Sequence, residues 1–526
     1  WLDRRHPVAN WWCVLTAGLT VVAALLDDAA LLARAREELA GCVDVLQEDG
    51  SYGESLQYGN YALYALMLAS EALRRRGEDV EQLVPIGRYV GYARWAVASY
   101  LYSKPTTGWG AAPKPRSLNF NDSGAVFKPT ADLLLHLAAR AAPTHPTEAG
   151  LARWLFDETY ASHPDQGPHD QASFGLRTDW GFLTLPLLPA AAAPLSPADA
   201  GLPATLAFSC GDSIARDAWG GRTVLALHGG GDPLNGPGHL HRALNTIILT
   251  HRDQRMLTDP GHSCYRNLLH TLEVATGTHN TCVFLRADGG VIEQHEPPRR
   301  IKHGKELGPP VDRGARRLLV AELADVRVIA SDAAATYGTP IRRFARFCIL
   351  CGAHVVFVVD HIVSTEPVCT RWHWLLNNRD GELDLNLAGP DRVVARRGDV
   401  GMKLFSLTGG ALEQRWAHVH DAYHCLPGQL GEGRPGSGVL LQWTAPHAAS
   451  ERLAVHAVAL DGYGAVAGWH LRATDSDVAL ESPDAQTRWA LTATAQQIKL
   501  TDQVADRAFV VRPGPDLKWS LASVNA

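Results

Sequence analysis

The sequence predicts an α+β protein with more than one domain, in which helical hairpins precede an antiparallel β-sandwich. With 526 residues the chain is too long for one ordinary hydrophobic core. From residue 10 to about 190, apolar residues recur three and four positions apart, as on amphipathic helices. Beyond about 205, short β-branched runs alternate with turns rich in Gly, Pro, Asp and Asn. A Pro- and Ala-rich segment at 190–204 separates these regions, so we expect domains at 1–195 and 205–526.

Individual segments support both halves of this prediction. DDAALLARAREELAGCVDVL (27–46) and NYALYALMLASEALRRR (60–76) carry the clearest helical pattern. CVLTAGLTVVAALL (13–26) is too short to span a bilayer, and we expect it to form a buried helix. RTVLALHG (222–229) and RFCILCGAHVVFVVDHIVS (346–364) represent the strand-like runs. Because no helices intervene between these runs, antiparallel sheets packed face to face are favoured over a parallel sheet.

The composition narrows the classes of partner. A net charge of -6 and the absence of a Lys or Arg run argue against nucleic acid, and no segment is suited to a membrane. Fifteen Trp and thirteen Tyr, several in loop-like contexts such as NWW and TGWG, suit a cleft that stacks on sugar rings. Core packing is the alternative for any single Trp. Nine Cys in a chain of this length do not form a dense disulfide framework.

The most distinctive motif is GHLHR at 238–242, because a carboxylate and a further histidine follow it. Asp259 lies in LTDPG and His279 in GTHNT. Two imidazoles and one carboxylate from separate segments suit a tetrahedral zinc site with an open fourth position. A His-x-His pair on a strand points both side chains to one face, and IILTHRDQRMLTDPG reads as strand, turn and strand. Such a hairpin would bring His241 and Asp259 together.

Two segments of the helical region carry further polar and aromatic candidates. EDGSYGESLQYGNY (48–61) places Glu54, Tyr58 and Tyr61 around a turn-rich loop that leads into a helix. A tyrosine near an active site serves as general acid or base when cations lower its pKa, whereas a packed tyrosine is the simpler alternative. RRHPVANWW (4–12) offers Asn10 and Trp11, and Asn10 is also suited to cap a helix.

The ordered succession of several motifs resembles the heparinase II/III-like polysaccharide lyases, which include alginate and heparin or heparan lyases. The motifs are ANWWCVLTAGLT, QEDGSYGESLQYGNY, NFNDSG, ARDAWGG, GPGHLHRALN, LTDPGHSCY and TGTHNT, over about the first 285 residues. The resemblance implies an N-terminal α/α toroid and a C-terminal antiparallel β-sandwich. The helical region is short for a full toroid, so an incomplete ring is expected. It further implies cleavage of uronic-acid polysaccharides by β-elimination in the cleft between the domains.

The resemblance also implies roles for single residues. Tyr58 corresponds to the catalytic tyrosine, which takes the C5 proton of the uronate, donates a proton to the leaving O4, or does both. His239 corresponds to a histidine that faces the cleft and assists. His241, Asp259 and His279 match ligands of a structural zinc. Asn10 or His6 corresponds to the catalytic Asn or His that many members have upstream of the tyrosine, and Arg216 resembles an arginine that binds a carboxylate. We expect contacts with the substrate from Glu54, Trp11, Tyr61 and Tyr265.

One departure concerns the group that neutralises the uronate carboxylate. The His-x-His of such lyases is often followed by an acidic residue, whereas Arg242 follows here, so this group stays open. The cationic loop HEPPRRIKHGK (295–305) would guide an acidic chain, and an ordinary solvated loop is its alternative.

Two other functions and several general properties stay open at this stage. A glycoside hydrolase on a toroid scaffold would use paired carboxylates such as Glu54 and Asp122, and a carbohydrate-binding protein would keep the fold without turnover. We expect an acidic polysaccharide or oligosaccharide as partner, and a homodimer is left open. A chain that begins at Trp1 without Met suggests a periplasmic or secreted protein whose signal peptide is removed, with a cytoplasmic location as the alternative.

Overall fold

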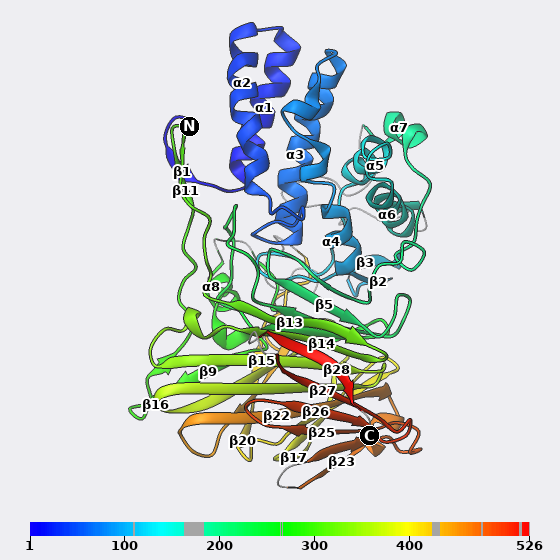
Figure 1. Ribbon diagram of the computed structural model, residues 1–526, viewed down its shortest axis with the longest axis vertical. Coiled ribbons are helices and arrows are strands. Elements are labelled where there is room, and N and C mark those ends of the chain that lie inside the picture. The colour runs from blue at the N-terminus through cyan, green and yellow to red at the C-terminus, as the bar shows by residue number, and fades with distance from the viewer. Residues whose placement is uncertain are drawn as a thin grey trace.

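The computed structural model combines helices in the N-terminal part with antiparallel sheets in the rest, stacked along the long axis of the molecule (Figure 1). This confirms the predicted fold class, an incomplete α/α toroid of helical hairpins followed by an antiparallel β-sandwich. The structure describes residues 1–108, 111–161, 183–263, 265, 267–422, 432–474, 477–514 and 518–524. In this part of the chain no helix is both long and apolar enough to cross a bilayer.

The helical part is built from hairpins whose ends follow local sequence signals. Asp28 caps the second helix by accepting hydrogen bonds from the backbone N–H groups of Ala30 and Leu31, and Ser55 caps the third by accepting one from Tyr58. Both predicted helices of this region are therefore confirmed. The helices are α1 (Asn10–Leu26), α2 (Ala29–Cys42), α3 (Leu56–Arg75), α4 (Tyr92–Ser99), α5 (Ala131–Arg140), α6 (Pro146–Phe156), α7 (Thr184–Leu187) and α8 (Leu269–Glu273).

The first helix differs from its prediction in burial. α1 packs against α2 and α3 on one side only, so Leu25 is 83% exposed and Leu26 is 65% exposed. Trp11 and Leu15 continue the exposed face toward the start of the helix. The segment is helical as expected, but the expectation of a buried helix is wrong, because an apolar composition does not reveal how many sides of a helix find a neighbour.

Most of the described strands form two sheets that share the long strand β16 and a separate six-stranded sheet, while β1, β11 and β12 form one small sheet and β2 and β3 another. The C-terminal half of β16 pairs with β9 and β21, and its N-terminal half pairs with β15 and β22. All pairings are antiparallel, as predicted. The bounds are as follows: β1 Arg5–Pro7, β2 Tyr100–Lys104, β3 Lys114–Ser117, β4 Thr205–Ala207, β5 Asp212–Arg216, β6 Thr223–His228, β7 Thr246–His251, β8 Gln254–Leu257, β9 Cys282–Leu285, β10 Val291–Ile292, β11 Ile301–His303, β12 Glu306–Leu307, β13 Arg316–Leu323, β14 Val326–Asp332, β15 Ile341–Cys351, β16 Val355–Asn377, β17 Asp384–Gly389, β18 Arg392–Arg397, β19 Val400–Ser406, β20 Ala411–Ala417, β21 Gly438–Thr444, β22 Ala449–Gly462, β23 His470–Ala473, β24 Val478–Glu481, β25 Arg488–Ala493, β26 Ile498–Asp502, β27 Arg507–Pro513 and β28 Trp519–Val524.

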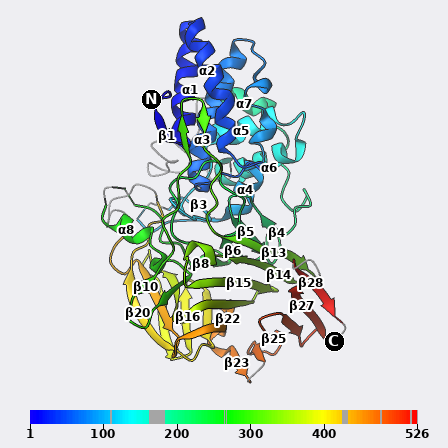
Figure 2. The same ribbon diagram turned by 60° about the vertical axis from the view of Figure 1, so that its left-hand side comes forward.

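Among the described residues, three large hydrophobic cores hold these layers together, and Leu375, Ala417, Val419 and Leu440 form a fourth, small cluster. One lies between the two sheets that share β16 and includes Leu249 and Val358. Another, with Phe357 and Phe509, lies between the sheet that contains β15 and β22 and the six-stranded sheet β23–β28. In Figure 2 β10 and β20, then β15 and β22, then β25 and β27 follow one another from left to right. The third core joins the helices to Ile214 of β5, so the helices cover one face of the sheet that contains β5, β6 and β7.

The junction of the helical part and the sheets carries the elements that matter for function. The last short helical turn of the N-terminal part ends at Ala190 and β4 begins at Thr205, while the division into domains at 1–195 and 205–526 stays a proposal. The N-terminal strand β1 pairs with β11, which extends from the sheet region. Lys302 of β11 lies 3.2 Å from the buried carboxylate of Glu38 on α2. The β1–β11 pairing thus joins the start of the helical part to the sheet region.

Candidate active site

The GHLHR motif lies on a loop between β6 and β7, so the expectation of a strand is wrong. The segment GGGDPLNGPGH before the second histidine is too rich in Gly and Pro for a strand interior. His239 has a φ of 51°, in the left-handed region, and an added Cβ on Gly238 would lie 2.6 Å from the Glu54 Oε1 atom. This backbone lets the two histidines take different environments: His241 is fully buried, whereas His239 lines a cleft.

The predicted hairpin of β7 and β8 is present, and it ends beside two of the histidines. Asp259 lies two residues after the end of β8, and its Oδ2 lies 3.4 Å from the Nε2 of His279. The same nitrogen lies 3.2 Å from the Nδ1 of His241. All three side chains are buried, and their ligand atoms lie within 4.8 Å of one another. The structure therefore brings together the trio predicted to bind zinc.

The surroundings of this trio suit a metal site. The Nδ1 of His279 is 2.7 Å from the Ala275 carbonyl, so an N–H there leaves the Nε2 lone pair toward the trio. Burial and the nearby His241 hold the pKa of His279 well below its usual range, which keeps the imidazole neutral. The Nε2 of His241 contacts Asp122 at 2.8 Å, so its Nδ1 is the atom that faces His279.

Asp259 gives the clearest sign that a cation fits here. Burial raises the pKa of this carboxyl group to about 7, and among the described residues its Oδ2 atom has no hydrogen-bond donor. A divalent cation would offset the cost of a buried carboxylate. Two imidazole nitrogens and one carboxylate oxygen are donors that zinc accepts. The residues present thus fit the ion that the sequence suggested.

Asp122, next to this trio, contacts both histidines of GHLHR. Its Oδ2 is 3.1 Å from His239 Nδ1, and its Oδ1 is 2.8 Å from His241 Nε2 and 3.1 Å from His262 Nδ1. Tyr265 donates a hydrogen bond to the Oδ2 at 2.9 Å. Burial alone would raise the pKa of Asp122, but the charge of His262 and the hydrogen bonds from the three histidines hold it well below its usual range. Asp122 is therefore an anion that links the buried trio to the cleft.

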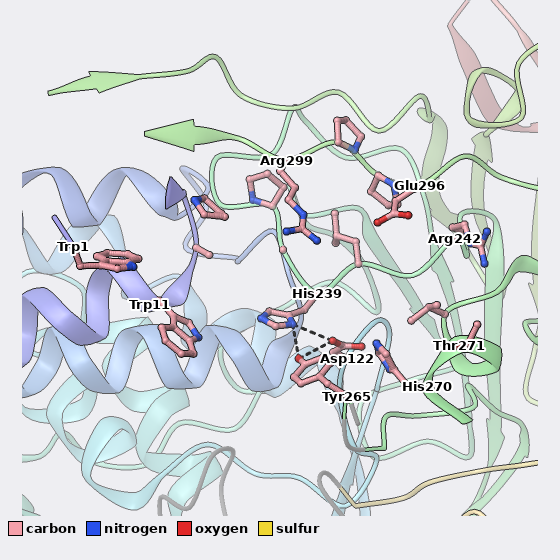
Figure 3. A pocket seen from close by; sticks show the side chains of 18 residues that line it. Trp1, Trp11, Asp122, His239, Arg242, Tyr265, His270, Thr271, Glu296 and Arg299 are labelled. Carbon is pink, nitrogen blue, oxygen red and sulfur yellow. Dashed lines mark hydrogen bonds and ion pairs between the residues drawn. The ribbon is translucent and has the colours of Figure 1, made fainter. Parts of the chain in front are cut away.

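Tyr58 and His239, the two residues predicted to be catalytic, lie next to Asp122. The Tyr58 ring stacks on His239 at 3.9 Å between centroids, with an angle of 13° between the planes. The Tyr58 hydroxyl is hydrogen-bonded to the Tyr265 hydroxyl, which also contacts His239 Nδ1. Figure 3 shows His239, Asp122 and Tyr265 pointing toward one another. Two phenols, an imidazole and a carboxylate thus form one hydrogen-bonded cluster, suited to move a proton over short distances.

Glu54 and Asn10 form the floor beneath this cluster. Asn10 Nδ2 donates to Glu54 Oε2 at 2.8 Å, and the Tyr52 hydroxyl donates to Oε1 at 2.9 Å. His239 Nε2 lies 3.9 Å from Glu54 Oε2. Burial raises the pKa of Glu54, and His239 acts in the opposite sense. Ala9, not Asn10, occupies the cap position of α1, so the interpretation of Asn10 as a helix cap is wrong.

The cleft above the cluster has a volume of about 750 Å³. Trp1 and Trp11 lie at one end in Figure 3, with Arg242 and Thr271 at the other. Five residues predicted to be catalytic or to contact the substrate are absent from its lining, namely Tyr58, Asn10, Glu54, Arg216 and Tyr61. Tyr58 is 1% exposed and lies behind Tyr265 and His239, and Asn10 and Glu54 are buried beneath them. The Arg216 guanidinium is buried and donates to the carbonyls of Ala98 and Tyr100 at 2.7 and 2.6 Å, because β5 turns it under the helices. Tyr61 packs against the helical core.

Sequence reasoning missed the central position of Asp122, which it considered only as a hydrolase carboxylate. The neighbouring Asn121 explains the placement. It has a φ of 61°, its amide donates to the Glu54 carbonyl at 2.7 Å, and its Oδ1 accepts from the backbone N–H of His241 at 3.0 Å. Asn tolerates this left-handed conformation better than most residues, so the Asn-Asp pair in NFNDSG is the one signal that pointed to a special turn.

A second group able to bind a metal adjoins the first. Asp122, His262 and His270 also bring one ligand atom each to within 4.8 Å. Because Asp122 is already engaged by His239, His241 and Tyr265, we do not assign a metal to this group.

Comparisons with known proteins show what this chain is similar to in sequence and fold. A family model described as alginate lyase matches residues 1–92, which include Asn10, Glu54 and Tyr58. The crystal structure of heparinase III has a TM-score of 0.64 at 11% identity, covering 98% of this chain and 67% of that one. Heparan sulfate lyase HepC from Pedobacter heparinus has a TM-score of 0.59 at 13% identity, covering 97% of this chain. A comparison with proteins of curated function gives no match.

The extent of these similarities sets what they show. This chain spans 65% of the length of HepC, which is less than two thirds. At identities of only 11% and 13%, the matches to these two structures show a shared fold and nothing finer. Together with the match over the N-terminal 92 residues, the comparisons confirm the resemblance of this chain to polysaccharide lyases with a helical toroid and a β-sandwich.

Proposed function

We propose that this chain is a polysaccharide lyase that cleaves a uronic-acid polysaccharide or oligosaccharide by β-elimination and leaves a 4,5-unsaturated uronate end. The observation that carries the proposal is the contact of the buried Tyr58 with Tyr265 and His239, which line an open cleft together with the Asp122 carboxylate. The alginate lyase match, which includes Tyr58, and the heparinase-like fold support it.

The first requirement of the reaction is the removal of a weakly acidic proton from C5. The base must lie within hydrogen-bond reach of that carbon, and the charge that develops beside the carboxylate must be stabilised by fixed donors. In the proposal the C5 proton passes to the Tyr58 phenolate, which lies directly behind Tyr265 and stacks on His239 of the cleft wall. His239 faces the cleft between two carboxylates, Glu54 and Asp122. Despite its burial, their charges raise the pKa of His239, so a positive charge is available for the substrate carboxylate.

The second requirement is a proton for the departing O4. As the C5–H bond breaks, its electron pair forms the C4–C5 double bond and the C4–O4 bond breaks. The Tyr265 hydroxyl is hydrogen-bonded to Tyr58 and lies in the cleft wall, so this pair of phenols can return one proton to O4 and keep the one taken from C5. No water is consumed in this balance, which separates the reaction from hydrolysis.

The remaining site residues have positioning roles in the proposal. Asn10 and Tyr52 occupy both oxygens of Glu54, which fixes that carboxylate under His239. A zinc ion held by His241, Asp259 and His279 would be structural. These ligands join the loop after β6, the end of β8 and the segment before β9, and so hold Asp122 in place through His241.

The geometry disfavours a glycoside hydrolase that uses Glu54 and Asp122. A hydrolase needs one protonated carboxyl group facing the scissile bond. Asp122 faces the cleft, but its pKa lies well below the usual range, so it is ionised. Glu54 has the raised pKa, but it is buried and hydrogen-bonded on both oxygens. Neither carboxylate combines access with a proton.

A panel of uronate polymers tests the proposal. Incubation with alginate, heparin, heparan sulfate and hyaluronan should produce an absorbance band at about 232 nm with at least one of them, as a conjugated C4–C5 double bond demands. New reducing ends without this band would indicate a hydrolase. Binding without any product would indicate a carbohydrate-binding protein, and both results would contradict the proposal.

A further inference from the structure

The cleft has two chemically different ends on either side of the His239 cluster. We call Trp1 and Trp11 the aromatic arm, and Arg242, Glu296 and Arg299 the charged arm. All five side chains line the cleft, and in Figure 3 the aromatic arm lies to one side of His239 while Arg242 and Glu296 lie to the other, with Arg299 above. The charged arm has no part in the chemistry described above. It therefore needs an explanation of its own.

The backbone that carries Arg299 is fixed by its neighbour. Arg300 is buried, and its guanidinium donates to the carbonyls of Gly308 at 2.6 Å and Asn235 at 2.8 Å. The Arg300 carbonyl in turn accepts from the N–H of Val8 at 2.9 Å, where β1 and β11 begin to pair. Of the two consecutive arginines, one is thus a structural anchor and the other, Arg299, is exposed in the cleft.

Arg242 is held in a similar way. Its N–H donates to the Val274 carbonyl at 3.0 Å, and it directly follows the buried His241. Within the described part of the chain, neither Arg242 nor Arg299 has an ion pair or a side-chain hydrogen bond, and Glu296 forms no ion pair with them. Two arginines and one glutamate leave a formal charge of +1 in this arm. Guanidinium groups without a partner, carried by a backbone that hydrogen bonds hold in place beside a reaction centre, are suited to an anion from the ligand.

We propose that Arg242 and Arg299 form a subsite that binds an acidic group of the saccharide unit next to the one that reacts. A guanidinium binds a carboxylate or a sulfate ester through the same paired N–H groups, so the subsite takes an oxyanion in either form. On this assignment the bound saccharide places one sugar unit against the aromatic arm and an acidic sugar unit in the charged arm. The orientation of the chain rests on the proposed function, whereas the anion subsite itself does not.

Saccharide binding to the Tyr58→Phe protein tests the subsite without turnover. The probes are an unsulfated mannuronate trisaccharide and a sulfated heparan sulfate tetrasaccharide, titrated by calorimetry. Arg242→Gln and Arg299→Gln should each weaken binding by about 10-fold, as expected for a hydrogen-bonded charge pair that is partly shielded from water. Arg242→Lys and Arg299→Lys keep the charge without the planar fork and should give a smaller loss. Unchanged thermal melting of each variant shows that the fold is kept.

Lys305→Gln is the matched control. Lys305 lies near Arg299 in sequence, its side chain is 85% exposed, and it pairs with Glu37 away from the cleft, so the variant removes one positive charge without touching the subsite. Loss of affinity for both probes identifies a carboxylate as the ligand group, and loss for the sulfated probe alone identifies a sulfate. The subsite is overturned if the arginine variants bind like the Lys305→Gln control, or if neither probe binds the parent protein. Arginine-dependent binding without lyase product would retain the subsite and reject the proposed function.

Discussion

Replacement of Tyr58 by Phe should reduce turnover by about 1,000-fold or more while the protein keeps its fold. The substitution removes only the hydroxyl that contacts Tyr265 and leaves the ring stacked on His239. A general acid or base contributes about 100- to 10,000-fold, and loss of a group that serves both steps should lie at the upper end. Initial rates on the best substrate of the uronate panel, with thermal melting of both proteins, provide the measurement.

Tyr61→Phe is the control for this prediction. Tyr61 lies three residues further along the same helix and is half-buried against the helical core, whereas Tyr58 contacts His239 and Tyr265. Its loss of a hydroxyl should change the rate by no more than about 2-fold, as for most substitutions away from a functional site. If Tyr58→Phe retained a tenth of the activity, the proton transfer would have to be assigned to another residue, with Tyr265 the first to examine.

His241→Ala should remove the metal and destabilise the protein at the same time. The trio of His241, Asp259 and His279 is buried. Because burial raises the pKa of the Asp259 carboxyl group to about 7, its ionised form is disfavoured unless a cation is bound. A metal ion present at a free concentration of about 1,000 times its dissociation constant stabilises the folded protein by about 4 kcal/mol, and the variant loses this contribution. Metal analysis of protein purified without chelator should find about one zinc per chain in the parent and little in the variant.

His239→Ala is the informative partner of that variant. His239 and His241 are two residues apart, but His239 lies in the cleft wall and His241 among the buried trio. His239→Ala should keep the zinc and the melting temperature and lose turnover. Equal loss of metal in both variants would contradict the separate roles, and full zinc content in His241→Ala would remove the metal site from the account.

The sequence predicted more of the fold than of the contacts within the site. Periodic apolar spacing is a property of each segment alone, so the helices α2 and α3 and the hairpin of β7 and β8 followed from the pattern. The donor types in GHLHR, LTDPG and GTHNT predicted the trio, and the family resemblance gave Tyr58 its catalytic role. The strand expected at GHLHR failed because nearby glycines and a left-handed φ at His239 form a loop instead.

The residues that sequence reasoning misplaced depend on contacts between distant segments. Asp122 gained its role from Asn121, which bridges the Glu54 carbonyl and the His241 N–H, and no local pattern encodes that bridge. Arg216 looked equally suited to a carboxylate, but its position on β5 buries it against the carbonyls of Ala98 and Tyr100. Charge type can be read from a sequence, whereas the access of a side chain to a cleft cannot.

The mass balance of the products tests the central claim most directly. An elimination divides the substrate without adding water, so the masses of the two fragments from a defined uronate oligosaccharide should sum to the mass of the substrate. Mass spectrometry of a complete digest measures this sum, and the Tyr58→Phe protein should leave the oligosaccharide intact. Fragments that sum to the substrate plus one water would show hydrolysis and contradict the proposed lyase.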